Sequence, residues 1–236
     1  MWGIFLFLSL FCCLTTIMNA MIFLLALIGI LSVVLIFRHK AALTRRDFFI
    51  GGILAVLCMP SNFIMGIFVF PAYLASASVL KQSTDPIFLW DNQKTHNLAK
   101  TGGCIFVIGG ILGALNLWLA LGDHTFNLSF QVNWIFEALR AGIFEEVTCR
   151  MFFFALCVCA TKNASLSKGQ NLLCYAAMIL PHVLLHINQG INLQSIVILS
   201  LLYGLPFAIM QRKQNLLSAI GAHSLVDFVR FVAFGG

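Results

Sequence analysis

Long apolar runs, separated only by short polar segments, are the feature that most limits how this chain can fold. Of its 236 residues, 61% are hydrophobic and 9% are charged, whereas about a quarter of the residues of a soluble domain are charged. A hydrocarbon core of about 30 Å is crossed by about 20 apolar residues in a helix. The sequence therefore predicts an all-α, polytopic membrane protein with roughly 7–8 transmembrane helices.

Polar breaks set the expected helix positions. Residues 48–80 are interrupted at Pro60, which removes a backbone donor, so this stretch forms either one kinked span or a tight hairpin. Residues 1–37 are too long for one span, so two segments meeting near Asn19 are expected, the first of them retained as a span. We expect N-terminal helices within 1–121 and a core within 132–233. The remaining expected helices cover about 102–121, 132–160, 171–187, 193–210 and 216–233.

Basic residues indicate the orientation. The densest positive cluster, Arg38 to Arg46, is expected on the cytoplasmic side. The hairpin interpretation of 48–80 puts the basic loops 161–170 and 211–215 on that same side, whereas a single kinked span puts them outside. The net charge of +6 then fits anionic membrane lipid rather than nucleic acid. All eight cysteines lie in apolar runs and form no CxxC pair, which argues against a disulfide framework or a cysteine metal site.

Ionisable residues inside apolar helices are concentrated after residue 131. A charge in hydrocarbon costs about 2.5–3.5 kcal/mol even on insertion scales, so each such residue is a functional candidate. The candidates are Glu137, Arg140, Glu145, Glu146, Arg150, His182, His186, His223, Asp227 and Arg230.

Two adjacent glutamates have different expected roles. Glu146 and Arg150 are one helical turn apart and can pair along one face, while Glu145 points about 100° away. Glu145 is then the carboxylate that is free for chemistry. A purely structural network, in which the glutamates pair with Arg140 and Arg150, is the competing interpretation.

Histidines at helical spacing supply groups for proton transfer. His182 and His186 share one helix face, and imidazole is the side chain best suited to proton transfer near neutral pH. His223 and Asp227 are also four apart, so Asp227 can accept a hydrogen bond from His223 and fix its tautomer. Each pair alone is explained as well by a hydrogen bond in a helix core. Together with a glutamate they could activate water and hold an oxyanion.

These segments, in this order, resemble the motifs of the CPBP family of intramembrane proteases, also called the ABI or CAAX-protease-like family. The resemblance covers about residues 132–233. The first motif, EExxxR, and the third, a histidine followed four residues later by Asn or Asp, are matched by Glu145, Glu146, Arg150, His223 and Asp227.

The second motif, FxxxH, is matched with a departure. With His186 as the motif histidine, His182 stands at the phenylalanine position, and with His182 instead, Met178 stands there. We prefer His186, because the following residues 187–190 look like the turn that often follows the motif histidine in bacterial members.

The resemblance implies peptide-bond hydrolysis in the membrane by a conical catalytic helix bundle in the C-terminal half. If the matching residues have the roles that they have in the family, Glu145 and His186 would activate the attacking water, and His223 and Asp227 would stabilise the oxyanion. No cofactor is expected.

The same resemblance implies supporting roles and partners. Glu146 and Arg150 would organise the first helix, and His182 is a further supporting residue. The expected partners are membrane lipid and a peptide or protein substrate, with lipid-modified substrates such as prenylated CAAX proteins among the candidates. The expected location is the bacterial inner membrane.

Two alternatives stay open. His182, His186 and Glu145 could hold zinc, since two histidines at i, i+4 suit a metal, although no HExxH motif occurs. A non-enzymatic membrane immunity or binding protein, or a proton-coupled transporter, could use the same buried Glu, His and Asp residues as a relay. Matched internal repeats would favour transport, and none is visible in the sequence.

Overall fold

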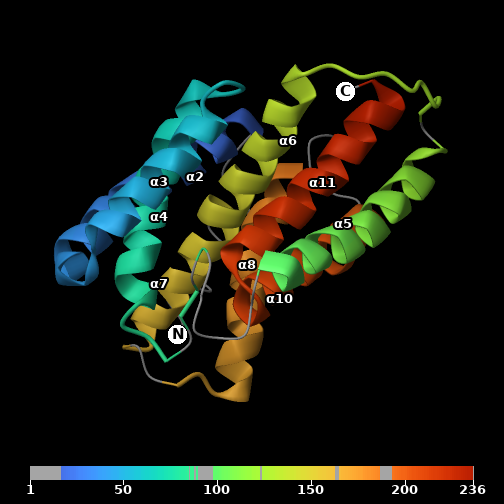
Figure 1. Ribbon diagram of the computed structural model, residues 1–236. Helices are drawn as coiled ribbons and strands as arrows, with labels where there is room; N and C mark the ends of the chain where they lie inside the picture. The colour runs from blue at the N-terminus through green and yellow to red at the C-terminus, as the bar shows by residue number, and fades with distance from the viewer. Residues whose placement is uncertain are drawn as a thin grey trace.

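The computed structural model is a bundle of helices, with no strand among the residues that it describes (Figure 1). These residues are 17–84, 86, 87, 89, 98–122, 124–162, 165–186 and 193–235, with the backbone alone for 17–21. The expected all-α class is therefore confirmed for the described residues. The expected first span, residues 1–18, lies outside them except for the start of α2 (Ile17–His39).

The N-terminal part ends in a helical hairpin. A short 3₁₀ turn, Lys40–Ala42, follows α2, and the hairpin consists of α3 (Arg45–Cys58) and α4 (Phe63–Leu80). Pro60 lies in the turn between them, where its missing N–H costs no helical hydrogen bond. Both α2 and α3 pack against α4. Of the two interpretations of 48–80, the hairpin is the correct one.

The second half begins with α5 (Leu98–Ala120) and then a long helix in three sections. These sections are α6 (Asn133–Phe144), a π-helical stretch over Glu145–Met151, and α7 (Phe152–Ala160). The expected helix over 132–160 is thus present, but its centre is not α-helical. π turns inside α-helices are rare in proteins, and many of those that occur lie at functional sites.

Three further helical segments complete the bundle. α8 (Lys168–His186) runs back along α7, and the next segment consists of α9 (Leu193–Ile198), a second π-helical stretch over Leu199–Gly204, and α10 (Leu205–Lys213). α11 (Leu216–Phe234) lies between α5 and α6 (Figure 1). Its start is fixed by Asn215, which caps Ser218 N–H at 2.7 Å and donates to Thr101 of α5 at 3.1 Å.

Close contact of α11 with its neighbours depends on small residues. A Cβ at Gly109 of α5 would lie 3.0 Å from the carbonyl oxygen of Ala222, and one at Gly142 of α6 would lie 2.8 Å from that of Ile220. Because both glycines lack a Cβ, α5 and α6 approach the backbone of α11 directly. This approach brings the C-terminal end of α6, next to Glu145, against the first turns of α11.

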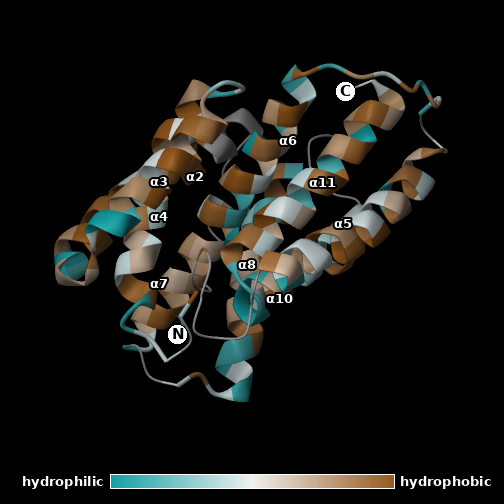
Figure 2. Ribbon diagram, in the orientation of Figure 1, coloured by the Kyte–Doolittle hydropathy of each residue, from teal (hydrophilic) through white to brown (hydrophobic). Residues whose placement is uncertain are grey.

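Five helices in the described part are long and apolar enough to cross a membrane: Ile22–Ala42, Phe63–Leu80, Leu98–Ala120, Leu193–Lys213 and Leu216–Phe234. Large apolar side chains of α5, such as Phe106, Ile111 and Trp118, are exposed, and much of the ribbon of α5 has the brown colour of hydrophobic residues in Figure 2. The protein is therefore an integral membrane protein. The count of roughly 7–8 spans is not confirmed, because α3 has only 14 residues and the segments 133–160 and 168–186 carry many polar groups.

Basic segments from distant parts of the chain lie near one end of the bundle. His39 approaches Cys159 at the end of α7, with 4.0 Å between Nε2 and Sγ, and Lys81 pairs with Asp47 of α3. The end of α10 is fixed to the start of α8 by Arg212, which donates to Asn171 at 2.8 Å. This arrangement agrees with the hairpin interpretation, in which the basic loops share one side. Their assignment to the cytoplasm stays a prediction.

Candidate active site

The π-helical stretch carries the two adjacent glutamates into the middle of the bundle. Glu146 and Arg150 are both completely buried and form an ion pair, with 2.5 Å between Oε1 and Nη1. A buried charge is tolerated only with a partner and further hydrogen bonds. Gln211 of α10 supplies these by donating from Nε2 to the backbone carbonyl of Glu146 at 2.9 Å, and it lies 3.5 Å from Oε2.

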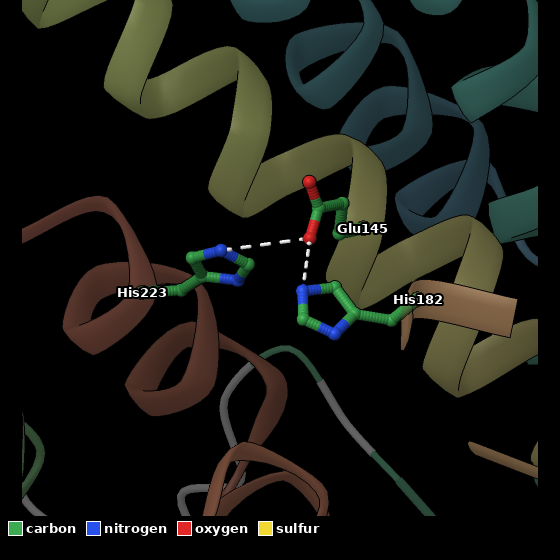
Figure 3. Close-up of side chains that lie close together, drawn as sticks. All are labelled: Glu145, His182 and His223. Carbon is green, nitrogen blue, oxygen red and sulfur yellow. Dashed lines mark ion pairs between the residues drawn. The ribbon is translucent and has the colours of Figure 1, made fainter. Parts of the chain in front are cut away.

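Glu145 faces a separate group of histidines. Its Oε2 lies 2.7 Å from Nε2 of His182 and 3.6 Å from Nε2 of His223, and the three side chains come from three different helices (Figure 3). Its Oε1 lies 3.5 Å from Nε2 of His186. No arginine pairs with Glu145 among the described residues, because Arg140 pairs with Glu137 one turn away at 3.0 Å. The competing network of both glutamates with Arg140 and Arg150 is therefore only half present.

The two histidines of α8 differ in their environment. The side chain of His182 is 3% exposed, whereas that of His186, the last residue of α8, is 45% exposed. Their rings pack edge to face with centroids 4.7 Å apart. Both can therefore contact the same carboxylate, but only His186 is accessible from outside the bundle. The turn expected at residues 187–190 lies outside the described residues.

His223 is oriented by Glu146 rather than by Asp227. Its Nδ1 lies 2.9 Å from Oε1 of Glu146, and since a carboxylate only accepts, Nδ1 carries the proton of this hydrogen bond. Asp227 Oδ2 lies 3.6 Å from Nε2, which is too long for a hydrogen bond. The expectation that Asp227 fixes the tautomer of His223 is wrong in this structure. Nε2 instead faces the space between Glu145 and Asp227.

Two residues that contact this site were missed in the sequence. Gln211 was assigned to a loop over 211–215, but it lies in α10 and is buried. Phe207 was treated as part of an apolar helix, but its ring stacks on the imidazole of His223 with centroids 4.8 Å apart and planes 5° apart. Their spacing of four residues places both on one face of α10, yet it could not show which face meets the site.

The side chains around Glu145 are of the kinds that bind a metal ion. Glu145, His182 and His223 each offer a ligand atom, and these atoms all lie within 4.8 Å of one another. One carboxylate and two imidazoles are a known zinc ligand set. The buried Oε2 of Glu145 also receives no aligned hydrogen bond within the described part of the chain. The zinc set expected from sequence contained His186 in place of His223, and the clustering favours His223.

A comparison with models of known families gives a match to the C-terminal half of the chain. The family model described as type II CAAX prenyl endopeptidase Rce1-like matches residues 127–229. No curated protein and no solved structure matches the chain. The matched segment contains every residue of the cluster around Glu145 and Glu146, together with Phe207 and Gln211.

Proposed function

Since residues 127–229 match the family model of type II CAAX prenyl endopeptidases, we propose that this chain is an intramembrane endopeptidase of the CPBP family, which hydrolyses a peptide bond with a water molecule activated by Glu145. The observation that carries this proposal is the environment of Glu145. Its buried Oε2 has two imidazole nitrogens within 3.6 Å, and the nearby arginine is paired with Glu146 instead. A carboxylate without a fixed cationic partner keeps the capacity to accept a proton.

The proposed reaction uses the groups on the two sides of Glu145. Glu145 accepts a proton from water, and the water oxygen attacks the scissile carbonyl carbon while the carbonyl electron pair moves onto its oxygen. When the tetrahedral intermediate collapses, the C–N bond breaks and the proton passes to the leaving nitrogen. In this proposal His186 relays that proton, which is supported by its distance of 3.5 Å from Oε1 and by its half-exposed side chain. His182 holds the carboxylate in position.

Stabilisation of the oxyanion falls to His223 in this proposal. With Nδ1–H donated to Glu146, the ring donates from Nε2 only as an imidazolium. The carboxylate of Glu146 on the Nδ1 side stabilises this cation, and Asp227 lies 3.6 Å from Nε2. The substrate is a peptide or protein within the membrane, and the matching family points to prenylated CAAX peptides as the first class to test.

A zinc-dependent variant of the same hydrolysis is a second candidate. Glu145, His182 and His223 would be the ligands, and a bound zinc ion would supply Lewis acidity and lower the pKa of a water molecule. It is favoured by one observation, the clustering of one oxygen and two nitrogen atoms within 4.8 Å.

The test measures cleavage of membrane-tethered and prenylated reporter peptides by detergent-purified protein. Glu145→Gln should reduce the rate at least about 100-fold, the scale on which proton transfer by a positioned side chain contributes. The matched control is Glu137→Gln, which removes another glutamate from the same helix but lies outside the cluster. Cleavage that survives a zinc chelator supports the metal-free reaction, and cleavage abolished by chelator and restored by zinc supports the second candidate. Absence of cleavage by the wild type across the panel would overturn the proposal.

A further inference from the structure

One face of the second π-helical stretch and of α10, which follows it, contacts the buried centre of the site at three successive turns. The carbonyl of Tyr203 lies 3.5 Å from Nη2 of Arg150. The ring of Phe207 stacks on His223 and also lies under the guanidinium of Arg150, 5.5 Å from its centroid. Gln211 donates to Glu146. These three residues are spaced four apart, so one helix face touches Arg150, His223 and Glu146, the three buried residues that meet at Oε1 of Glu146.

The contacts reach Glu146 and His223 but not the reacting space beside Glu145. Phe207 and Gln211 are each 1% exposed, so neither side chain is open to a peptide in the membrane. A flat aromatic ring parallel to an imidazole restricts rotation of that imidazole about its χ2 bond, because tilting would bring ring atoms into contact. The amide of Gln211 restricts the backbone and carboxylate of Glu146, which in turn holds Nδ1 of His223.

We propose that Phe207 and Gln211 are positioning residues that together fix the tautomer and the ring plane of His223, so that its Nε2 is held toward Glu145. The expected effect of these residues on the rate of cleavage rests on the proposed function. The orientation of His223 does not, because it can be measured in the protein without substrate. Phe207 acts through the ring face, and Gln211 acts through Glu146. Neither residue touches the reacting atoms.

The position of α10 that makes these contacts has its own local cause. A Cβ at Gly204, at the end of the second π-helical stretch, would lie 2.6 Å from Cγ2 of Ile179. Glycine therefore lets the beginning of α10 pack directly on α8, while Pro206 occupies the first turn of α10, where a missing N–H is tolerated. From this position Phe207, in the same turn, contacts His223 of α11, and Gln211, one turn later, contacts Glu146 of the π-helical stretch.

The first measurement is the nitrogen NMR spectrum of histidine-labelled protein, with the His223 signals assigned by their loss in His223→Gln. In the wild type, Nδ1 should be protonated both in the neutral ring and in the imidazolium, because its proton is held by Glu146. Phe207→Leu and Gln211→Met should each shift or broaden these signals, because the ring exchanges between tautomers or orientations. Phe207→Tyr keeps the ring and should restore the wild-type pattern. Phe152→Leu removes an equally buried ring of α7 and should leave His223 unchanged.

The second measurement is kinetic, on the same variants and reporter peptides. Phe207→Leu and Gln211→Met should lower kcat about 10- to 100-fold, the scale of an orienting partner, with KM unchanged, since neither residue contacts substrate. Unchanged His223 signals in both variants, or a loss of rate equal to that of Phe152→Leu, would overturn the inference. If the His223 signals change as expected while the wild type cleaves nothing, the proposed function fails and the positioning of His223 stands.

Discussion

Nδ1 of His223 lies 2.9 Å from Oε1 of Glu146, although the two residues are 77 positions apart in the chain. The same oxygen accepts from Arg150. One buried carboxylate oxygen thus joins α11 to the π-helical stretch between α6 and α7. Glu146 is occupied by Arg150 and by Nδ1 of His223, whereas Glu145 faces the Nε2 atoms of the three histidines.

Removal of the Glu146 charge should destabilise the protein strongly. Glu146→Gln leaves the guanidinium of Arg150 buried without a counter-charge, and breaking one side of a buried pair costs about 3–5 kcal/mol. The free energy of unfolding in detergent measures this effect. Glu137→Gln is the control, because the Glu137–Arg140 pair is 36% and 22% exposed and such pairs contribute about 0–1 kcal/mol.

The double variant Glu146→Gln/Arg150→Met tests the reason for that loss. If the cost comes from an uncompensated charge, removing both charges should recover a large part of the stability lost in Glu146→Gln. A double variant as unstable as the sum of its two single variants would instead assign the cost to lost packing.

Substitution of Gly142 should separate α6 from α11. A Cβ there would lie 2.8 Å from the carbonyl oxygen of Ile220 and 3.1 Å from Ser224 N–H, so Gly142→Ala requires the backbones to move apart. We expect lower thermal stability and lower peptidase activity together. Gly110→Ala in α5 has nothing within 4 Å of the added atom, and alanine should stabilise that helix by up to about 1 kcal/mol. Equal melting temperatures for the two variants would contradict this.

The two histidines of α8 should differ in their effect on catalysis. His186→Gln removes the exposed proton relay and should lower kcat about 100-fold or more. His182→Gln removes a side chain that holds Glu145 and should lower kcat about 10- to 100-fold. Steady-state kinetics on one reporter peptide compare the two. A larger loss in His182→Gln than in His186→Gln would reverse the two assigned roles.

An acid-labile contact should join the two ends of the α3–α4 hairpin, where Lys81 pairs with Asp47. Burial raises the pKa of Asp47, but hydrogen bonds from Lys81 and Thr44 more than offset this and hold the pKa below 3.8. A depressed pKa contributes stability above the ordinary value, and this stability is lost as the pH falls through the folded-state value. The wild type should therefore lose more stability than Asp47→Asn on acidification below about pH 5. Parallel pH profiles of the melting temperature would contradict the prediction.

Most of the fold was predictable because it depends on local patterns. Apolar runs of membrane-spanning length predict helices regardless of their neighbours, and the described helices fall close to the expected ranges. Pro60 marked the hairpin turn, although the sequence alone left a kinked span equally open. The Glu146–Arg150 pair was predictable from its spacing of four residues, and it is present.

The missed features of the site depend on contacts between distant segments. Nothing within α11 distinguishes Asp227, one turn from His223, from Glu146 on another helix as the partner of Nδ1. Phe207 and Gln211 became visible only when α10 was placed against α11, because an apolar helix presents several faces of similar composition. The π-helical stretch has no local sequence signal that we can identify. The roles of all these residues in catalysis stay predictions.

The π-helical stretch also changes the direction in which side chains point, so that residues of α7 face other sides than they would if α6 continued as a regular α-helix. A π turn is equivalent to one residue inserted in an α-helix, and each α-helical residue advances by about 100°. Deleting Thr148 would let the helix run regularly. It would also rotate either the glutamates away from the histidines or α7 away from α4. Comparisons of this chain with other sequences should therefore treat a one-residue length difference at this place as a change of active-site geometry.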